Sequence, residues 1–418
     1  MSLRYTIVAF FCSFSVVLAD DLANSGGAAG NSAAMAPSVA AAAAADSHDE
    51  GYKKFTEYMD DYMRVKLGAG LRTSFRTVEN GAPNGSTASK SFQLDNMRLY
   101  VNGKILDYIG VEFNTEIGDG VHPGAEDVGI LDAVVKLEAS DLFNIWAGRF
   151  LPPSDRSNLD GPFFLNAYDF PLAQAYPARF AGRDTGIAYW GQVKEGMFKW
   201  QAGAFEGSNA ASNQKDHPLF AGRLVLNLLD PEPGYYNSST YYGSKDVLAV
   251  GLAGMYQQDH SGTLGETNDF GGFNVDVLFE KKLTEDIVDS QLLTDGVATL
   301  EGAYYVYDDN DLDDDFGNPT LVGGPASRQG ESFLILASFL FPTQFGVGVL
   351  QGQLQPYFRY QRYNRALDAP GLIESGIDTG VNYVLDGHNA RISLFYSGQD
   401  PQGGSTIDSA VLAGQFQF

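Results

Sequence analysis

Apolar and polar residues alternate along most of the chain, beginning at Met63. In the first such segment one face carries Met63, Val65, Leu67, Ala69, Leu71, Thr73 and Phe75, and the other carries Arg64, Lys66, Gly68, Gly70, Arg72, Ser74 and Arg76. Successive side chains of a β-strand point to opposite faces, so this period predicts a strand with one apolar and one polar face. The pattern predicts about sixteen strands, which start near residues 63, 91, 107, 129, 143, 185, 197, 218, 245, 270, 296, 330, 350, 372, 389 and 405.

The connections between these strands alternate in length. Compact connections lie near 105–107, 140–142, 194–196 and 386–388, and longer ones near 79–90, 119–128, 151–184, 208–217, 259–269 and 308–329. Short turns at one end and long loops at the other are typical of a barrel in the outer membrane, whose strand number is even in a single chain. Two connections, near 230–244 and 284–295, are longer than a periplasmic turn usually is.

One face of strand after strand carries almost no Lys, Arg, Asp or Glu. Leu224, Leu226 and Leu228, for example, alternate with Arg223 and Asn227. A face in contact with lipid and a face in contact with water would produce this pattern, and the terminal amphipathic strand that ends in a phenylalanine is expected of an outer-membrane barrel. A soluble β protein also alternates and stays an alternative. We predict an all-β fold, a transmembrane antiparallel β-barrel in the outer membrane of a Gram-negative bacterium.

The N-terminal region is predicted to lie outside the barrel. Arg4, an apolar stretch from Ile7 to Leu18 and the small residue Ala19 predict a signal peptide over residues 1–19. Residues 20–62 are rich in Ala, Gly and Ser and are interpreted as a linker, in which 51–62 is either a short amphipathic helix or a solvated lead-in. The barrel is then expected over 63–418.

Composition agrees with an exported β protein. The chain has 48 Gly, 28 Phe and 22 Tyr, and after the signal it has no apolar run of about 18 residues, so no transmembrane helix is expected. The one cysteine, Cys12, lies inside the predicted signal. Disulfide bonds are therefore not expected to stabilise the mature chain.

Three segments in the middle of the chain carry a resemblance to a known family. They are residues 145–154 (IWAGRFLPPS), 181–187 (AGRDTGI) and 201–207 (QAGAFEG). In their order and spacing they resemble the phosphate-selective porins of the O and P type, and the resemblance covers most of the chain from about Leu94. It implies a sixteen-stranded barrel, a homotrimer and a third extracellular loop that folds into the lumen.

That third loop would be the connection 151–184. It contains five prolines and four phenylalanines, which can stiffen a long loop. By the family resemblance, Arg156, Arg179 and Arg183 would lie at the pore constriction. The alternative is that these arginines pair with neighbouring aspartates and only hold the shape of the loop. The loop contains no lysine, whereas selective members of the family carry a dense set of Arg and Lys there, so a general porin is favoured.

The position of the charges matters more than their sum. The formal net charge is −25, but many acidic residues fall in the predicted connections, above all in 308–315. The cations expected to point into the lumen are Arg64, Lys66, Arg72, Arg76, Arg98, Lys104, Lys136, Lys199, Arg223, Arg359, Arg365 and Arg391. The expected inward acids are fewer, namely Asp95, Glu112, Glu116, Asp132 and Glu138. This distribution predicts a mainly basic lumen wall and a weak preference for anions.

No motif of an enzyme is present. The chain has no Gly-x-Ser-x-Gly and no His-Glu-x-x-His, and its five histidines are scattered. We expect no cofactor, no catalytic site and no nucleic-acid partner, and we expect membrane lipid, small ions and polar solutes as partners. The acidic cluster 308–315 is interpreted as a solvated loop, with a weak calcium site as the alternative. A barrel that acts as a scaffold or sheath for another protein is the alternative function, and a surface adhesin is a more remote one.

Overall fold

The fold is a closed, antiparallel β-barrel. The structure is a computed structural model, and it describes residues 64–117, 128–172, 182–290, 292–308, 330–365 and 373–418. The strands are β1 (Arg64–Val78), β2 (Ser91–Leu106), β3 (Ile109–Ile117), β4 (Val128–Ser140), β5 (Phe143–Phe150), β6 (Asp184–Val193), β7 (Phe198–Phe205), β8 (Leu219–Asn227), β9 (Val247–Gly262), β10 (Thr267–Lys282), β11 (Val297–Asp308), β12 (Gly330–Leu340), β13 (Gln344–Phe345), β14 (Gly352–Arg365), β15 (Ile373–Asp386), β16 (Ala390–Pro401) and β17 (Ile407–Gln417). The described helices are α3 (Arg156–Asp160), η1 (Lys194–Gly196) and η2 (Gly348–Leu350).

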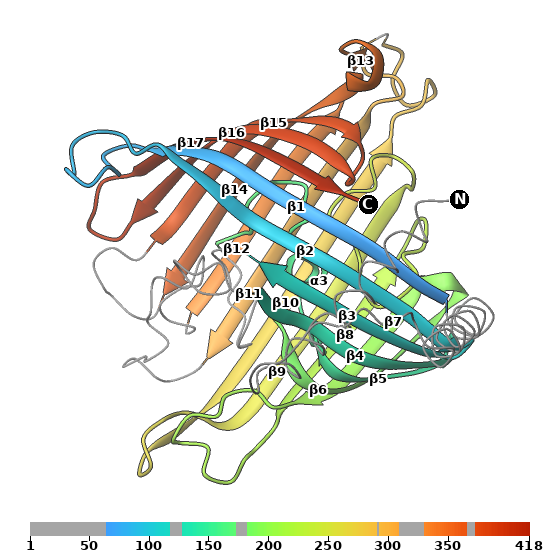
Figure 1. Cartoon of the computed structure of the whole chain (residues 1–418), viewed down its shortest axis with the longest axis vertical. Helices are drawn as coiled ribbons and strands as arrows, with labels where there is room; N and C mark the ends of the chain where they lie inside the picture. The colour runs from blue at the N-terminus through green and yellow to red at the C-terminus, as the bar shows by residue number, and fades with distance from the viewer. Residues whose placement is uncertain (1–63, 118–127, 173–181, 291, 309–329, 366–372) are drawn as a thin grey trace, which may run out of the picture. The chain divides into compact units, whose positions relative to one another are not determined.

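Each strand of the barrel pairs with the next barrel strand along the chain, and the last pairs with the first. Residues 70–78 of β1 pair with residues 409–417 of β17, which closes the ring (Figure 1). The two-residue strand β13 pairs with β14, while β12 and β14 also pair directly. Sixteen strands therefore form the closed barrel and β13 lies outside it. The predicted strand number is confirmed, and β13 is an addition too short to leave a periodic signal.

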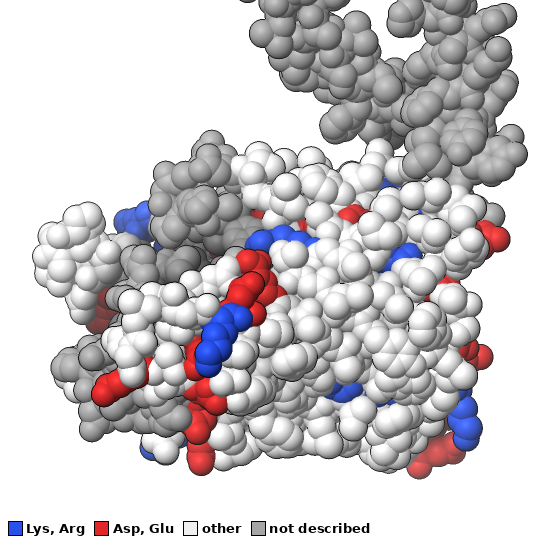
Figure 2. Space-filling view, turned by 90° about the horizontal axis from the view of Figure 1, so that it is seen from below, with Lys and Arg blue, Asp and Glu red and all other residues white. Residues whose placement is uncertain are grey.

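The alternation seen in the sequence separates the two faces of the barrel. Outward positions are apolar and exposed, as at Leu71 (38%), Leu224 (47%) and Leu394 (60%), whereas the intervening Arg72 and Arg223 are buried at 4% and 2% exposure. Figure 2 shows uncharged residues over most of one face of the molecule. An apolar exterior around a charged interior is the arrangement that a lipid environment requires. Among the described residues, no helix is long and apolar enough to span a bilayer.

One predicted orientation is wrong. A strict alternation places Leu131 on the outward face of its strand with Ala133 and Val135, opposite Asp132 and Lys136, but Leu131 is fully buried. The pairing of β3 with β4 shifts register here, since Asn114 pairs with Asp132 and Thr115 with Ile130, so Leu131 has no partner. A β-bulge of this kind changes the parity of the strand. Residues 128–130 and 133–135 then keep their apolar side chains outward on either side of the bulge.

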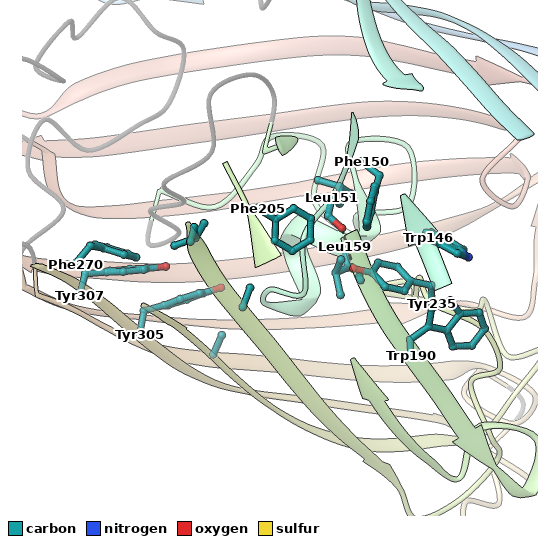
Figure 3. Close-up of a cluster of buried hydrophobic side chains, with 14 of the residues drawn as sticks. Trp146, Phe150, Leu151, Leu159, Trp190, Phe205, Tyr235, Phe270, Tyr305 and Tyr307 are labelled. Atoms are coloured by element: carbon teal, nitrogen blue, oxygen red, sulfur yellow. Dashed lines mark hydrogen bonds between the residues drawn. The ribbon is translucent and has the colours of Figure 1, made fainter. Parts of the chain in front are cut away.

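The barrel interior holds an apolar cluster as well as charges. Trp146, Trp190 and Tyr235 lie together, and the rings of Trp146 and Tyr235 stack with centroids 4.5 Å apart (Figure 3). Tyr305 and Tyr307 of β11 belong to the same cluster, with stacked rings. Part of the interior is therefore packed like a protein core. The alternation gave no indication of this, because it assigns inward positions to polar residues.

Candidate pore and constriction

The connection between β5 and β6 contacts strands from different parts of the ring. We call residues Ser154–Leu172 of this connection the inner segment. Side chains donate to its carbonyl groups from β16, where Arg391 reaches Leu165 O at 2.8 Å, and from β17, where Gln415 reaches Phe163 O at 2.8 Å. On another part of the ring, Tyr305 of β11 donates to the Asp155 carboxylate at 3.1 Å. The inner segment therefore contacts inward-pointing side chains of strands from separate parts of the ring.

A short buried helix, α3, forms the start of the inner segment. The Asp155 side chain caps it by accepting a hydrogen bond from Asn158 N at 3.1 Å, and all five residues of α3 are buried. The chain leaves α3 at Gly161, whose φ of 65° suits a residue without a side chain. Burial and the nearby charge of Asp276 raise the pKa of Asp155 to about 6, and burial also raises the pKa of Asp160.

Arg156, the first predicted constriction residue, is held by a distant carboxylate. Its guanidinium donates to both carboxylate oxygens of Glu232, at 2.8 and 2.7 Å, and to Ser238 O at 2.8 Å. Each of the two side chains in this ion pair is 1% exposed. Burial alone would raise the pKa of Glu232, but the charge and hydrogen bonds of Arg156 lower it to about 2. The main partner of Arg156 is thus the distant Glu232, and not one of the neighbouring aspartates that the alternative prediction named.

The other two predicted constriction arginines have different outcomes. Arg183 forms an ion pair with Asp132 of β4, with Nε 3.1 Å from Oδ1. The adjacent Asp184 accepts hydrogen bonds from Thr185 N and Gly207 N, both at 2.7 Å, and so holds the start of β6. Arg179 lies outside the described residues. Arg156 and Arg183 are thus brought into the barrel, but each is engaged with an acid.

Most of the predicted pore-lining cations on strands have described partners. Arg76 pairs with Asp169, Arg98 with Glu116, Lys136 with Glu112, Arg223 with Asp276 and Arg359 with Asp378. Arg72 lies over the ring of Tyr168 and donates to its carbonyl, and Arg391 donates to carbonyls of the inner segment. Lys199 is buried and Lys66 is exposed. The side chains of Arg64 and Arg365 are not among those that the structure describes.

The expectation of a mainly basic lumen wall is wrong for the described residues. Four more buried carboxylates occupy inward positions on strands: Asp276 and Glu280 of β10, Glu301 of β11 and Asp378 of β15. The inward orientation of Asp276 and Glu280 could have been predicted from the sequence, since polar and apolar residues alternate there. Asn274, Asp276 and Glu280 alternate with Val275, Val277 and Phe279. Acids therefore accompany the cations around the ring.

A second connection also contributes buried residues to the interior. The chain from 228 to 246, between β8 and β9, supplies Glu232 to Arg156 and the buried Tyr235 to the apolar cluster. Its Tyr235 hydroxyl donates to Leu151 O at 2.9 Å. The sequence signalled this connection only by its unusual length.

The described residues contain no candidate metal site. No group of three or more His, Cys, Asp or Glu side chains suited to a metal ion occurs in the described part of the chain. The predicted alternative of a calcium site in the acidic cluster falls on residues 309–315, which lie outside the described residues, together with Asp308 at the end of β11.

Comparison with known proteins identifies the fold. No protein-family model and no curated protein match the sequence. Among solved structures, the anion-selective porin from Comamonas acidovorans is similar with a TM-score of 0.54 at 13% identity, covering 85% of this chain and 100% of that chain. The OmpF of Salmonella typhi in complex with daunomycin gives a TM-score of 0.51 at 11% identity, covering 86% and 99%. The chain has the fold of the bacterial porins.

Proposed function

We propose that this protein is an outer-membrane porin, a passive diffusion channel for small hydrophilic solutes and ions. The observation that carries the proposal is the closed barrel whose outward side chains are apolar and whose inward side chains are charged. Such a barrel is stable in lipid and presents polar groups to water inside. The inner segment, which approaches strands on different parts of the ring, acts as the constriction.

Ion selectivity is the finer part of the proposal. A channel selects ions by pore width and by the charges that line the passage. Arg98, Arg223 and Arg359 each lie against a carboxylate, so their fields are largely balanced close to the wall. We therefore expect at most a weak preference for anions. Phosphate selectivity, which the family resemblance implies, would need cations without such partners at the constriction.

Planar-bilayer recordings test both parts. Purified protein is expected to produce stepwise conductance, with a small reversal potential of anionic sign under a potassium chloride gradient. A clear cationic sign would overturn the anion preference and leave the channel intact. Complete absence of conductance steps from every correctly folded form of the protein, variants included, would overturn the porin.

Specific contacts favour a second candidate, a barrel that serves as a scaffold for another protein. The inner segment and the connection between β8 and β9 both place buried residues in the interior. The chain itself therefore fills part of the lumen, as expected of a barrel that does not conduct. A folded but silent barrel, and a partner recovered with it from native membranes, would favour this function.

The homotrimer implied by the family resemblance is a further proposal, which chemical cross-linking in detergent tests.

A further inference from the structure

Two connections from opposite ends of the barrel meet in its interior. In an antiparallel barrel, successive connections alternate between the two ends, so the one after β5 and the one after β8 lie at opposite ends. The first contains the inner segment. We call residues Pro231–Gly243 of the second the counter-loop. The two segments enter from opposite sides and touch.

Their contact is mainly polar. The bidentate pair of Arg156 with Glu232 is its centre, and Asp160 at the end of α3 accepts a hydrogen bond from Ser239 Oγ at 2.5 Å. Asn237 donates to the same Asp160 carboxylate. All of the acidic and basic groups in this contact are buried. A buried ion pair is costly to break one partner at a time, because the remaining charge is left without compensation.

The barrel wall anchors the counter-loop from its other side. Glu280 of β10 accepts hydrogen bonds from Thr240 Oγ1 at 2.7 Å, Tyr241 N at 3.0 Å and Gly243 N at 2.9 Å. Its opposite part is fixed by Tyr235, which stacks on Trp146. The counter-loop is therefore positioned by the wall and presents Glu232 and Ser239 to the inner segment.

We propose that the counter-loop is the second half of the pore constriction, and that its latch to the inner segment, formed by Arg156–Glu232 and Asp160–Ser239, sets how far the pore is open. This inference rests on the proposed porin function. With the latch formed, buried side chains occupy the space between the two segments. When it is released, Glu280 of β10 still holds the counter-loop, and Arg391 and Gln415 still hold the inner segment. The space between the two segments then becomes available to water and solute.

Single-channel conductance of latch variants tests the inference. Glu232→Gln removes the charge that holds Arg156 and is expected to raise the conductance on the order of twofold or more, or the frequency of an open level. Asp295→Asn is the matched control. Asp295 is 66% exposed in the connection between β10 and β11, pairs with Lys282 at the end of β10, and has a left-handed backbone that Asn also adopts. The control is expected to conduct like the wild type.

A reversible cross-link keeps the test valid where Glu232→Gln folds poorly. The Asp160 and Ser239 side chains touch, so cysteines at both positions lie within reach of each other, and the predicted mature chain has no other cysteine. Oxidised glutathione closes the disulfide and dithiothreitol opens it. We expect low conductance after oxidation and higher conductance after reduction in the same folded sample.

The outcomes separate the inference from the function on which it rests. Higher conductance in Glu232→Gln and a reversible change in the cysteine pair support the latch. Equal conductance in the wild type, Glu232→Gln and both redox states of the cysteine pair overturns the latch while the porin stands. Silence of every folded form, the reduced cysteine pair included, overturns the porin and the latch together.

Discussion

Arg98 and Glu116 lie on neighbouring strands, and the sequence could place both of them inward by parity alone. Their register makes them direct neighbours across β2 and β3, which is why they pair. Arg156 and Glu232 are 76 residues apart in two connections, and neither parity nor register relates them. Orientation on a strand is thus predictable from a period of two. A pair formed between loops is not, because it depends on the path of the backbone between them.

At the residue scale, replacing Asp155 with Asn is expected to change the pH dependence of stability. Burial and the charge of Asp276 raise the pKa of Asp155 from the ordinary aspartate range to about 6. Because the folded protein then binds this proton more tightly than the unfolded chain, the contribution to stability is full below the unfolded pKa of about 4 and is lost as pH rises through about 6.

Asp155→Asn should therefore gain stability relative to the wild type as the pH goes from 4 to 8. The gain is at most about 3 kcal/mol, since one pKa unit corresponds to about 1.4 kcal/mol. Asn retains an oxygen that can accept the hydrogen bond from Asn158 N, so the cap of α3 is kept. Thermal unfolding of both proteins at several pH values measures the difference. A difference that stays constant across this range would show that Asp155 is ionised equally in both states.

At the scale of elements, the sequence predicted the strands better than the connections. Each of the sixteen barrel strands begins within a few residues of its predicted start, because lipid outside and polar groups inside impose a strict alternation. The sequence pattern did not reveal the bulge at Leu131. The one additional residue is itself apolar, so the segments on both sides of it still show apolar residues at alternate positions. The counter-loop appeared only as excess length between β8 and β9. Its entry into the barrel depends on Glu280 and Arg156, which lie far from it in the sequence.

Packing of the inner segment against β1 can be tested at a glycine. A Cβ added to Gly70 would lie 2.7 Å from Cζ of Phe163, closer than van der Waals contact allows. Gly70→Ala should therefore displace the inner segment and lower the free energy of unfolding by about 1–3 kcal/mol. The matched control is Gly271→Ala in β10, where an added Cβ meets no atom within 4 Å and the change should stay within about 0.5 kcal/mol. Urea unfolding measures both, and equal stability of the two variants would contradict close packing of Phe163 on β1.

At the scale of the whole molecule, the arrangement of residue types is the reverse of that in a soluble protein. The net charge of −25 coexists with an exterior on which Leu, Ile, Val and Phe are exposed, while arginines such as Arg223 and Arg391 are almost completely buried. The apolar cluster around Trp146 adds a core inside the ring as well. The sequence could predict two faces of different chemistry. It could not say how much of the inner face is packed, because the segments that cover it come from two connections.

The outward face gives the most direct test of a membrane environment. Leu394 lies within β16, is 60% exposed, and neighbours the outward Leu412 across the pair with β17. In a bilayer, Leu394→Arg is expected to cost up to about 2–4 kcal/mol, because an arginine on the lipid-facing side of the barrel loses its hydration. Leu264, 71% exposed in the connection between β9 and β10, is the control, and Leu264→Arg should have almost no effect. Reversible unfolding from lipid vesicles measures both variants. If Leu394→Arg were as harmless as Leu264→Arg, this face would be in contact with water, and a membrane barrel would be excluded.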